Sequence, residues 1–426
     1  MKVAAEPDLP PPFVCSRVRA VRAAIRTYWS TSLCGVTTPR LADVLKVLDE
    51  QYPPGWADEW DAVGTVVGDP DSAVSKVMFA VDPVRAVVDE AIEWGADLIV
   101  THHPLLLRAV NGVPATTPKG AVVHDLIRAN VALHTCHTNA DSPPGGVSAS
   151  MADALALREV APLDPDPAES LDKLITFVPH DDTQRVVDAL SVAGAGNIGE
   201  YDRCYFTTPG TGSFRPSAAA NPTIGSAGEI EEVAESRVEM VLPRTRRSAV
   251  LAALRTAHPY EEPAFDLFEL ATVPSDRGSG RIGALEEPMT VREFAGAVVR
   301  ALPSTPSAAR IAGDPERSVR TVALCGGAGD FLLDRARRAG ADVYVTSDLR
   351  HHPVSELQEE PDAPAVIDVP HWAAEWTWLP VAERALADRL AAEGATVETR
   401  VSRVVTDPWT MHLPLAPATT TQRSFR

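Results

Sequence analysis

The segment Leu98-Ile-Val-Thr-His-His-Pro104 begins with a short apolar run, 98–101, which is followed directly by two adjacent histidines. It stands within a regular alternation of strand-like and helical patterns. Before it come a β-rich run and a helical stretch that stops at Gly95, and after it come a helix and a second strand: Lys76–Val81, Val84–Trp94, Lys119–Ala129 and Val131–Thr135. Strands that alternate with helices of this length indicate βαβ units and a mostly parallel sheet.

The same alternation returns late in the chain, with strands Val319–Cys325, Asp342–Thr346 and Ala365–Asp368 and a helix Phe331–Ala339 closed by Gly340. Helical residues then run from His371 to about Glu393. Between the two halves the pattern reads β-α-β-β-α-β, the order of a ferredoxin-like unit. The sequence therefore predicts a two-part α/β domain, with a parallel or mixed sheet, interrupted by a ferredoxin-like α+β insert.

The predicted boundaries are 38–169 and 273–412 for the two halves, 170–272 for the insert, 1–37 for a disordered extension and 413–426 for a disordered tail. The extension is rich in arginine, which a targeting peptide would also be, and the tail is polar and unpatterned. Within the insert, a Gly/Pro/Ser-rich stretch from Pro209 to Gly228 predicts a long loop.

Composition and charge exclude several classes of function. The 426 residues include 39 basic and 58 acidic side chains, a net charge of −19, which repels phosphate backbones, so we do not expect nucleic-acid binding. No run of about 18 apolar residues predicts a membrane helix. Five well-separated cysteines without a C-x-x-C pair fit a reducing compartment, and we expect the protein to be cytoplasmic.

Histidines and carboxylates follow several of the predicted strands. Ligands of open α/β sheets bind at the carboxyl ends of the strands, so these side chains are candidates for one site. The candidates are His102, His103, His137, Asp141, Asp348, His352, His371 and Glu375. Each short segment taken alone also fits an exposed turn, a polar loop or a solvated His–Glu pair, and His134, inside a strand pattern, is expected to pack in the core.

Taken together, the candidates offer imidazole and carboxylate donors that suit Zn²⁺, Fe²⁺, Mn²⁺ or Co²⁺. Their number exceeds the needs of one tetrahedral ion. We therefore predict two divalent ions per subunit, zinc first, with Fe, Mn, Co or Ni as alternatives. Glu375 lies four residues after His371 on one helical face and is expected to bridge the two ions.

These motifs resemble those of the Nif-three-like dinuclear metal-centre proteins, also called the GTP cyclohydrolase 1 type 2 family. The resemblance covers Thr38 to about Trp409. Its motifs are Glu59-Trp-Asp-Ala-Val-Gly64, Thr101-His-His-Pro104, His137-Thr-Asn-Ala-Asp141, Cys325-Gly-Gly-Ala-Gly329, Thr346-Ser-Asp348 and Asp368-Val-Pro-His-Trp-Ala-Ala-Glu375. It implies two ions held by His102, His103, Asp141, His371 and Glu375, with His137 beside the site, and a homohexameric toroid.

The insert resembles PII-like and CutA-like trimeric modules through Tyr201-Asp-Arg-Cys204, Pro209-Gly-Thr-Gly-Ser-Phe-Arg-Pro216 and His258-Pro-Tyr-Glu-Glu-Pro263. In the last of these motifs, His258, Glu261 and Glu262 offer donors for a cation. A structural turn that leads into the last strand of the insert explains the same residues, and we favour it.

Two classes of function follow from the resemblance. The first is a metal-dependent hydrolase, with GTP cyclohydrolase the activity that the family name implies and a nucleotide or phosphorylated small molecule as substrate. His137 or His352 would transfer protons and Asp348 would act as an acid, a base or an outer partner. Arg350 or the amides of 326–329 would anchor phosphate, although a tight turn also explains these glycines. The second class is a non-enzymatic metal-binding regulator or scaffold.

Overall fold

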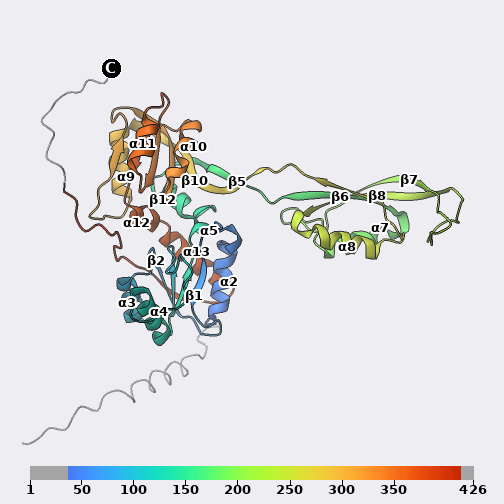
Figure 1. The fold of residues 1–426 in the computed structure, drawn as a ribbon, viewed down its shortest axis with the longest axis horizontal. Coiled ribbons are helices and arrows are strands. Elements are labelled where there is room, and N and C mark those ends of the chain that lie inside the picture. The colour runs from blue at the N-terminus through green and yellow to red at the C-terminus, as the bar shows by residue number, and fades with distance from the viewer. Residues whose placement is uncertain (1–36, 414–426) are drawn as a thin grey trace, which may run out of the picture. The chain divides into compact units, whose positions relative to one another are not determined.

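The computed structural model of the protein describes residues 37–413 (Figure 1). The predicted extension and tail therefore lie outside the described residues, apart from Thr37 and Leu413. The chain divides into two compact units, which we call unit 1 (described residues 37–164 and 277–413) and unit 2 (Pro165–Asp276). The predicted insert, 170–272, falls inside unit 2. None of the helices within residues 37–413 has the length and apolar character needed to cross a bilayer.

The first sheet of unit 1 has five strands in the order β1-β4-β3-β2-β15. They are β1 (Gly64–Val67), β2 (Lys76–Ala80), β3 (Leu98–Thr101), β4 (Ala132–Thr135) and β15 (Glu398–Val401). Strands β15, β2, β3 and β4 are parallel, and β1 runs antiparallel to β4. All four residues of β3 are buried, because helices cover both faces of this sheet.

Alternate residues of these strands enter two different cores. Phe79, Leu98 and Val100 pack with helices α2 (Leu41–Gln51) and α13 (Leu379–Ala392), whereas Met78, Ile99 and Leu133 pack with α3 (Arg85–Trp94) and α4 (Pro118–Ala129). In Figure 1, α3 and α4 lie together on one side of the sheet and α2 lies on the other. Helix α3 ends at Gly95, whose φ of 78° is the left-handed conformation that glycine adopts without strain.

The second sheet of unit 1 has six strands in the order β11-β14-β13-β12-β10-β5. Its parallel centre consists of β12, β13 and β14, and β10 and β11 pair antiparallel to it, so both sheets of unit 1 are mixed. The strands are β5 (Arg158–Pro167), β10 (Pro274–Thr290), β11 (Arg310–Ala312), β12 (Ser318–Ala328), β13 (Val343–Ser347) and β14 (Ala365–Asp368). The helices that accompany this half are α9 (Val291–Ala301), α10 (Leu333–Arg338), α11 (His351–Gln358) and α12 (His371–Trp376).

Unit 2 has the element order β6 (Leu171–Pro179), α7 (Thr183–Val192), β7 (Phe206–Phe214), β8 (Glu231–Pro243), α8 (Arg247–Ala257) and β9 (Phe265–Glu269). These strands form an antiparallel sheet in the order β7-β8-β6-β9. The loop predicted from Pro209 is wrong at its start, because the backbone of 209–214 continues β7 and pairs with β8. Proline is tolerated there because β7 is an edge strand.

A buried histidine in the first sheet makes folding stability sensitive to acid. His134, in β4, is only 3% exposed, its Nδ1 lies 3.0 Å from Thr65 Oγ1, and burial lowers its pKa to about 4. The unfolded chain, in which a histidine titrates near 6.5, binds this proton more readily than the folded chain does. This contribution to stability is therefore complete above about pH 6.5 and is lost as the pH falls towards 4.

We expect this histidine to remove about 2 kcal/mol of unfolding free energy between pH 7 and pH 5. In His134→Gln, which retains a hydrogen-bond partner for Thr65, the loss over the same interval should be smaller by about that amount. Urea unfolding of both proteins at the two pH values measures the difference. Parallel losses in the two proteins would contradict this role of His134.

Candidate metal centre

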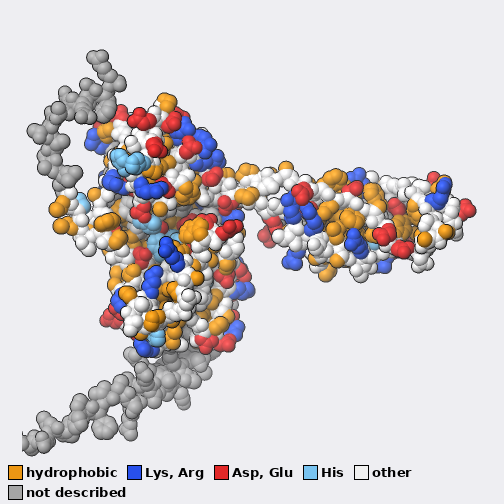
Figure 2. All heavy atoms as spheres, in the orientation of Figure 1, with side chains coloured by type: hydrophobic (Ala, Val, Ile, Leu, Met, Phe, Trp, Pro, Cys, Tyr) orange, Lys and Arg blue, Asp and Glu red, His pale blue; other side chains and the backbone are white. Residues whose placement is uncertain are grey.

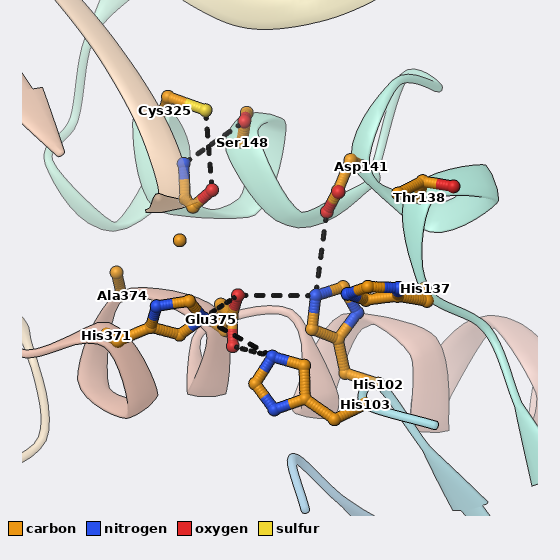
Figure 3. A network of polar contacts seen from close by, with 12 residues as sticks. His102, His103, His137, Thr138, Asp141, Ser148, Cys325, His371, Ala374 and Glu375 are labelled. Atoms are coloured by element: carbon orange, nitrogen blue, oxygen red, sulfur yellow. Dashed lines mark hydrogen bonds and ion pairs between the residues drawn. The ribbon is translucent and has the colours of Figure 1, made fainter. Parts of the chain in front are cut away.

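The carboxyl ends of strands from both sheets of unit 1 meet at one cluster of side chains (Figure 3). His102 and His103 directly follow β3. His137 and Asp141 follow β4, at the start and end of the short helix α5 (Thr138–Asp141), and α6 (Val147–Ala154) comes next in the chain. His371 and Glu375 belong to α12, which follows β14. The sequence predicts that these strand-end residues form one site; in the structure, that site lies where the rims of two separate sheets face each other.

Glu375 lies at the centre of this cluster and is only 3% exposed. Its Oε1 lies 2.8 Å from His371 Nε2 and 3.4 Å from His102 Nε2, and its Oε2 lies 3.1 Å from His103 Nε2. Asp141 Oδ1 approaches the same nitrogen, His102 Nε2, at 3.6 Å (Figure 3). The structure therefore brings together all five residues that the sequence motifs nominate as ligands.

Each imidazole of the cluster is held through its Nδ1 by a separate acceptor. His103 Nδ1 lies 2.7 Å from Asp82 Oδ1, His137 Nδ1 lies 2.7 Å from Asp61 Oδ1 and His371 Nδ1 lies 2.6 Å from Asp348 Oδ2. The fourth, His102 Nδ1, lies 3.0 Å from the carbonyl oxygen of Cys136. Such contacts favour the tautomer with its hydrogen on Nδ1 and leave the lone pair of Nε2 available to a metal ion. This is the arrangement found around metal-binding histidines.

The electrostatics of the cluster favour a positive charge at its centre. Burial by itself would raise the pKa of Glu375, but His103, His371 and His102 together hold it well below its usual value. Burial opposes protonation of His103 and His371, yet Glu375 and the outer carboxylates raise their pKa values to about 10 and about 11. Burial raises the pKa of Asp141 to about 7, and its Oδ1 has no hydrogen-bond partner among residues 37–413.

The donor spacing fits a divalent metal. Two donors that bind one Zn²⁺ tetrahedrally at about 2.1 Å lie about 3.4 Å apart. The separations between Glu375 and its histidines range from 2.8 to 3.4 Å, His102 Nε2 lies 3.6 Å from Asp141 Oδ1, and His103 Nε2 lies 3.3 Å from His371 Nε2. Two groups of three residues hold donors within 4.8 Å of one another: His102, His103 and His137, and His103, His371 and Glu375. The residues present therefore suit a metal ion.

Gly327, in the motif Cys325-Gly-Gly-Ala-Gly329, leaves the space that the Glu375 side chain occupies. Its φ is 73°, and a Cβ added there would lie 2.5 Å from Glu375 Oε1. The sequence suggested a phosphate anchor or a tight turn for this glycine run; the structure shows a further requirement for glycine, the close approach of the backbone to Glu375. Arg350, the other predicted phosphate anchor, is paired with Asp330.

The structure changes the interpretation of two predicted catalytic residues, His352 and Asp348. His352 is exposed in the first turn of α11, where its ring packs against His351 and not against the cluster. The sequence placed it near the site because it follows β13 closely, but helix α11 begins at His351 and carries its side chain to the surface. Asp348 contacts His371 Nδ1, so of the roles left open for it the outer partner fits best.

The supporting carboxylates Asp61 and Asp82 were missed as partners of histidines. Asp61 belongs to the quoted motif 59–64, and its Oδ2 also accepts hydrogen bonds from the backbone and hydroxyl of Thr138, at 3.0 and 2.6 Å. Asp82 stands just after β2. Their place after a strand or inside a motif was the available signal, but nothing in the sequence pairs either carboxylate with a particular histidine.

Fold and cluster together define a mixed α/β protein with a histidine–carboxylate centre suited to divalent metals. A family profile described as Duf34/NIF3 (NGG1p interacting factor 3) matches residues 39–408, and this chain belongs to that family. The family predicted from the sequence motifs is thereby confirmed.

Relatives and solved structures agree with this assignment. A GTP cyclohydrolase 1 type 2 homolog of Mycobacterium tuberculosis is 49% identical over 373 residues, which are 87% of this chain and 97% of that protein. The homolog of Halalkalibacterium halodurans is 39% identical over 86% of this chain and 97% of its own length. A Bacillus cereus protein related to NIF3 is similar in structure, with a TM-score of 0.70, 33% identity, and coverage of 88% of this chain and all of that one.

The close approach at Gly327 leads to a matched pair of substitutions. Gly340 has the same φ of 73° but open space where a Cβ would lie. Both alanine variants place a non-glycine residue in the left-handed region, which costs about 1–2 kcal/mol. Gly327→Ala should lose about 2 kcal/mol more than Gly340→Ala, because its Cβ displaces Glu375.

Gly327→Ala should also take up less metal, while Gly340→Ala should resemble the wild type. Denaturant unfolding and metal analysis after dialysis against Zn²⁺ test both expectations. Equal stability and equal metal content in the two variants would show that Gly327 does not shape the centre.

Proposed function

We propose that each chain holds two divalent ions and uses them to hydrolyse a nucleotide or another phosphorylated small molecule. One observation carries the proposal: histidine and carboxylate donors from two sheets converge on Glu375, in more positions than one ion would occupy. The ligands in this proposal are His102, His103, Asp141, His371 and Glu375, with zinc as the first candidate ion. The name GTP cyclohydrolase 1 type 2 homolog, which the relatives carry, supports GTP as the first substrate to test.

Bound divalent ions in such a centre would act as Lewis acids and lower the pKa of a coordinated water towards neutrality. The residues of the chain supply the remaining functions. His137 stands beside His102 and His103, with ring centroids 5.1 and 5.5 Å away, and Asp61 fixes its Nδ1. We assign it to proton transfer through Nε2, because a histidine with a fixed tautomer can exchange a proton at its other nitrogen.

A cavity of about 720 Å³ opens beside the cluster, which is in the size range of small-molecule sites. Its lining includes His103 and His371 from the cluster, together with Arg310, Trp372 and Trp409. Histidine atoms reach the molecular surface in this unit (Figure 2). The two tryptophans suit a substrate with a flat ring, whereas Arg310 is already paired with Asp368, which also lines the cavity.

The number of ions is tested by metal analysis and calorimetric titration of metal-free protein. We expect close to two Zn²⁺ per chain in the wild type. Glu375→Gln should bind at most one with ordinary affinity, because removing a shared carboxylate leaves two cations in repulsion at short range. Glu359→Gln, at an exposed position after α11, is the control and should bind as the wild type does. Two sites of unchanged affinity in Glu375→Gln would refute the shared role.

Turnover separates the enzyme from its alternative, a metal-binding regulator or scaffold. Zinc-loaded wild type should hydrolyse GTP or a related nucleotide, Glu375→Gln should lose this activity, and His137→Ala should retain both ions but work at least about 100-fold more slowly. Chromatography of the reaction products measures all three. A fully loaded wild type that leaves every nucleotide intact would favour the non-enzymatic alternative.

A further inference from the structure

Unit 2 contains a cavity of its own, with a volume of about 650 Å³. It lies on the sheet face opposite the helices. Phe177, Glu235 and Arg237 line it, whereas the alternate residues Val178 and Val238 pack into the core with α7 and α8. In Figure 1 both helices lie on one side of the sheet formed by β6, β7 and β8. The cavity is therefore built on the face that the helices leave open.

Two motifs that the candidate metal centre does not use form its walls. Strand β7 and the residues after it supply 208–216, and the turn before β9 supplies Tyr260, Glu261 and Glu262. The loop between β7 and β8 is tied to this turn, since Asn221 N donates to Glu261 Oε2 at 3.1 Å and Thr223 Oγ1 donates to the carbonyl of Pro259 at 2.6 Å. These two hydrogen bonds hold the loop at the edge of the cavity.

Glu235 is the most enclosed charged group of the lining, with only 7% of its surface exposed. Tyr260 donates its hydroxyl to Glu235 Oε1 at 2.7 Å; burial raises the pKa of Tyr260, and this contact raises it further. A Cβ at Gly212 would lie 2.2 Å from Glu235 Oε2, so glycine is needed there for the carboxylate to fit. A buried carboxylate with one neutral donor retains capacity to accept further hydrogen bonds.

The motif 258–263 builds this arrangement as a structural turn. His258 Nε2 lies 2.9 Å from the carbonyl of Phe177, and His258 Nδ1 accepts the backbone N–H of Tyr260 at 3.1 Å. One nitrogen donates and the other accepts, so the imidazole is neutral and both of its nitrogens are occupied. It therefore stabilises the turn and is not a metal ligand. Tyr260 then packs edge-on against Phe214, with ring centroids 5.5 Å apart. The turn therefore aims the tyrosine hydroxyl at Glu235.

We propose that this cavity binds a small organic cation with a flat apolar body. The apolar lining comes from Phe177, Phe214 and Ile224, among others, and aromatic faces attract cations. Three carboxylates line the cavity, from Glu235, Glu261 and Glu262, against two arginines. One of these, Arg237, is paired with Glu239, which lies outside the lining, at 3.1 Å. The charge balance at the enclosed end is therefore negative. The N–H groups of a cation could donate the further hydrogen bonds that the Glu235 carboxylate can accept.

Benzamidine is the probe for this proposal, because it joins an aromatic ring to a charged amidinium group. Isothermal titration uses the full chain loaded with zinc, so that the carboxylates of the metal centre do not offer a second cation site. Benzoate, with the same ring and the opposite charge, should not bind. Glu235→Gln keeps the shape of the side chain and removes its charge, and it should weaken benzamidine binding at least tenfold.

Gly210 supplies an independent variant with a matched control. It pairs with Glu235 across the strands, and a Cβ at this position would meet no atom within 4 Å. Gly210→Leu should fill the cavity and abolish binding, while Thr207→Leu, on the same strand but outside the lining, should leave the affinity within twofold of wild type. Circular dichroism and thermal melting check that the variants are folded, and Glu235→Gln decides the question if Gly210→Leu is not.

Three results would overturn the proposal: no benzamidine binding by wild type, equal binding by Glu235→Gln, or benzoate binding as tight as that of benzamidine. Each of them leaves the proposed function of unit 1 unaffected. Conversely, failure of nucleotide turnover at the metal centre would not change the expectation for this cavity, because all of its lining residues belong to unit 2.

Discussion

A buried carboxylate that touches three imidazoles is the interaction on which the organisation of unit 1 depends. Glu375 has almost no contact with solvent, and its two oxygens face His102, His103 and His371. Burying a charge in this way is costly unless opposite charge compensates it. The histidines provide that compensation as long as they are protonated, and a divalent cation would provide it when they are not. The need for positive charge at this point explains why donors from two sheets gather there.

The supporting contacts extend the same constraint outward. Asp82, Asp61, Asp348 and the carbonyl of Cys136 each hold one imidazole through Nδ1, so the orientation of every ring follows from a residue near the end of a strand. Parallel strands covered on both faces give these residues rigid positions. Gly327 completes the enclosure from the second sheet, because its missing side chain leaves space for Glu375. A centre assembled from strand ends combines rigid supports with an open side for a small molecule.

Unit 2 follows a different principle. Its helices and one face of its sheet form a core around Leu174, Val186, Met240 and Leu254, and this core is independent of the candidate metal centre. The opposite face carries charged and aromatic residues, and the loop after β7 encloses part of it as a cavity. The glycines at 210 and 212 serve the cavity in separate ways, one by leaving open space and the other by admitting a buried carboxylate.

The sequence by itself determined β2, β3, β4, β12, β13 and β14 with the helices α3 and α4, the β-α-β-β-α-β order of unit 2 and the residues of the candidate centre, but it did not reveal β1, β10, β11 or α9. Apolar periodicity and helix-ending residues such as Gly95 act locally, and the motifs name their residues directly. The sequence did not predict strand β15. Its residues alternate only between partly buried and exposed, and its partner in the first sheet, β2, lies more than 300 residues earlier in the chain. The sequence-based prediction also failed for His352, where closeness to a strand end in sequence did not become closeness in space.

Only the tertiary structure decided that two sheet rims meet at Glu375 and which acceptor holds each histidine. It also decided that the motif 258–263 forms a turn that positions Tyr260. These are contacts between residues tens to hundreds of positions apart, and a chain pattern specifies which face or strand end a side chain occupies but not its partner across the fold. The pairings of Asp61 with His137 and of Asp82 with His103 illustrate the limit. Asp61 precedes β1 and Asp82 follows β2, so each pairing depends on how that strand is placed relative to another strand of the sheet.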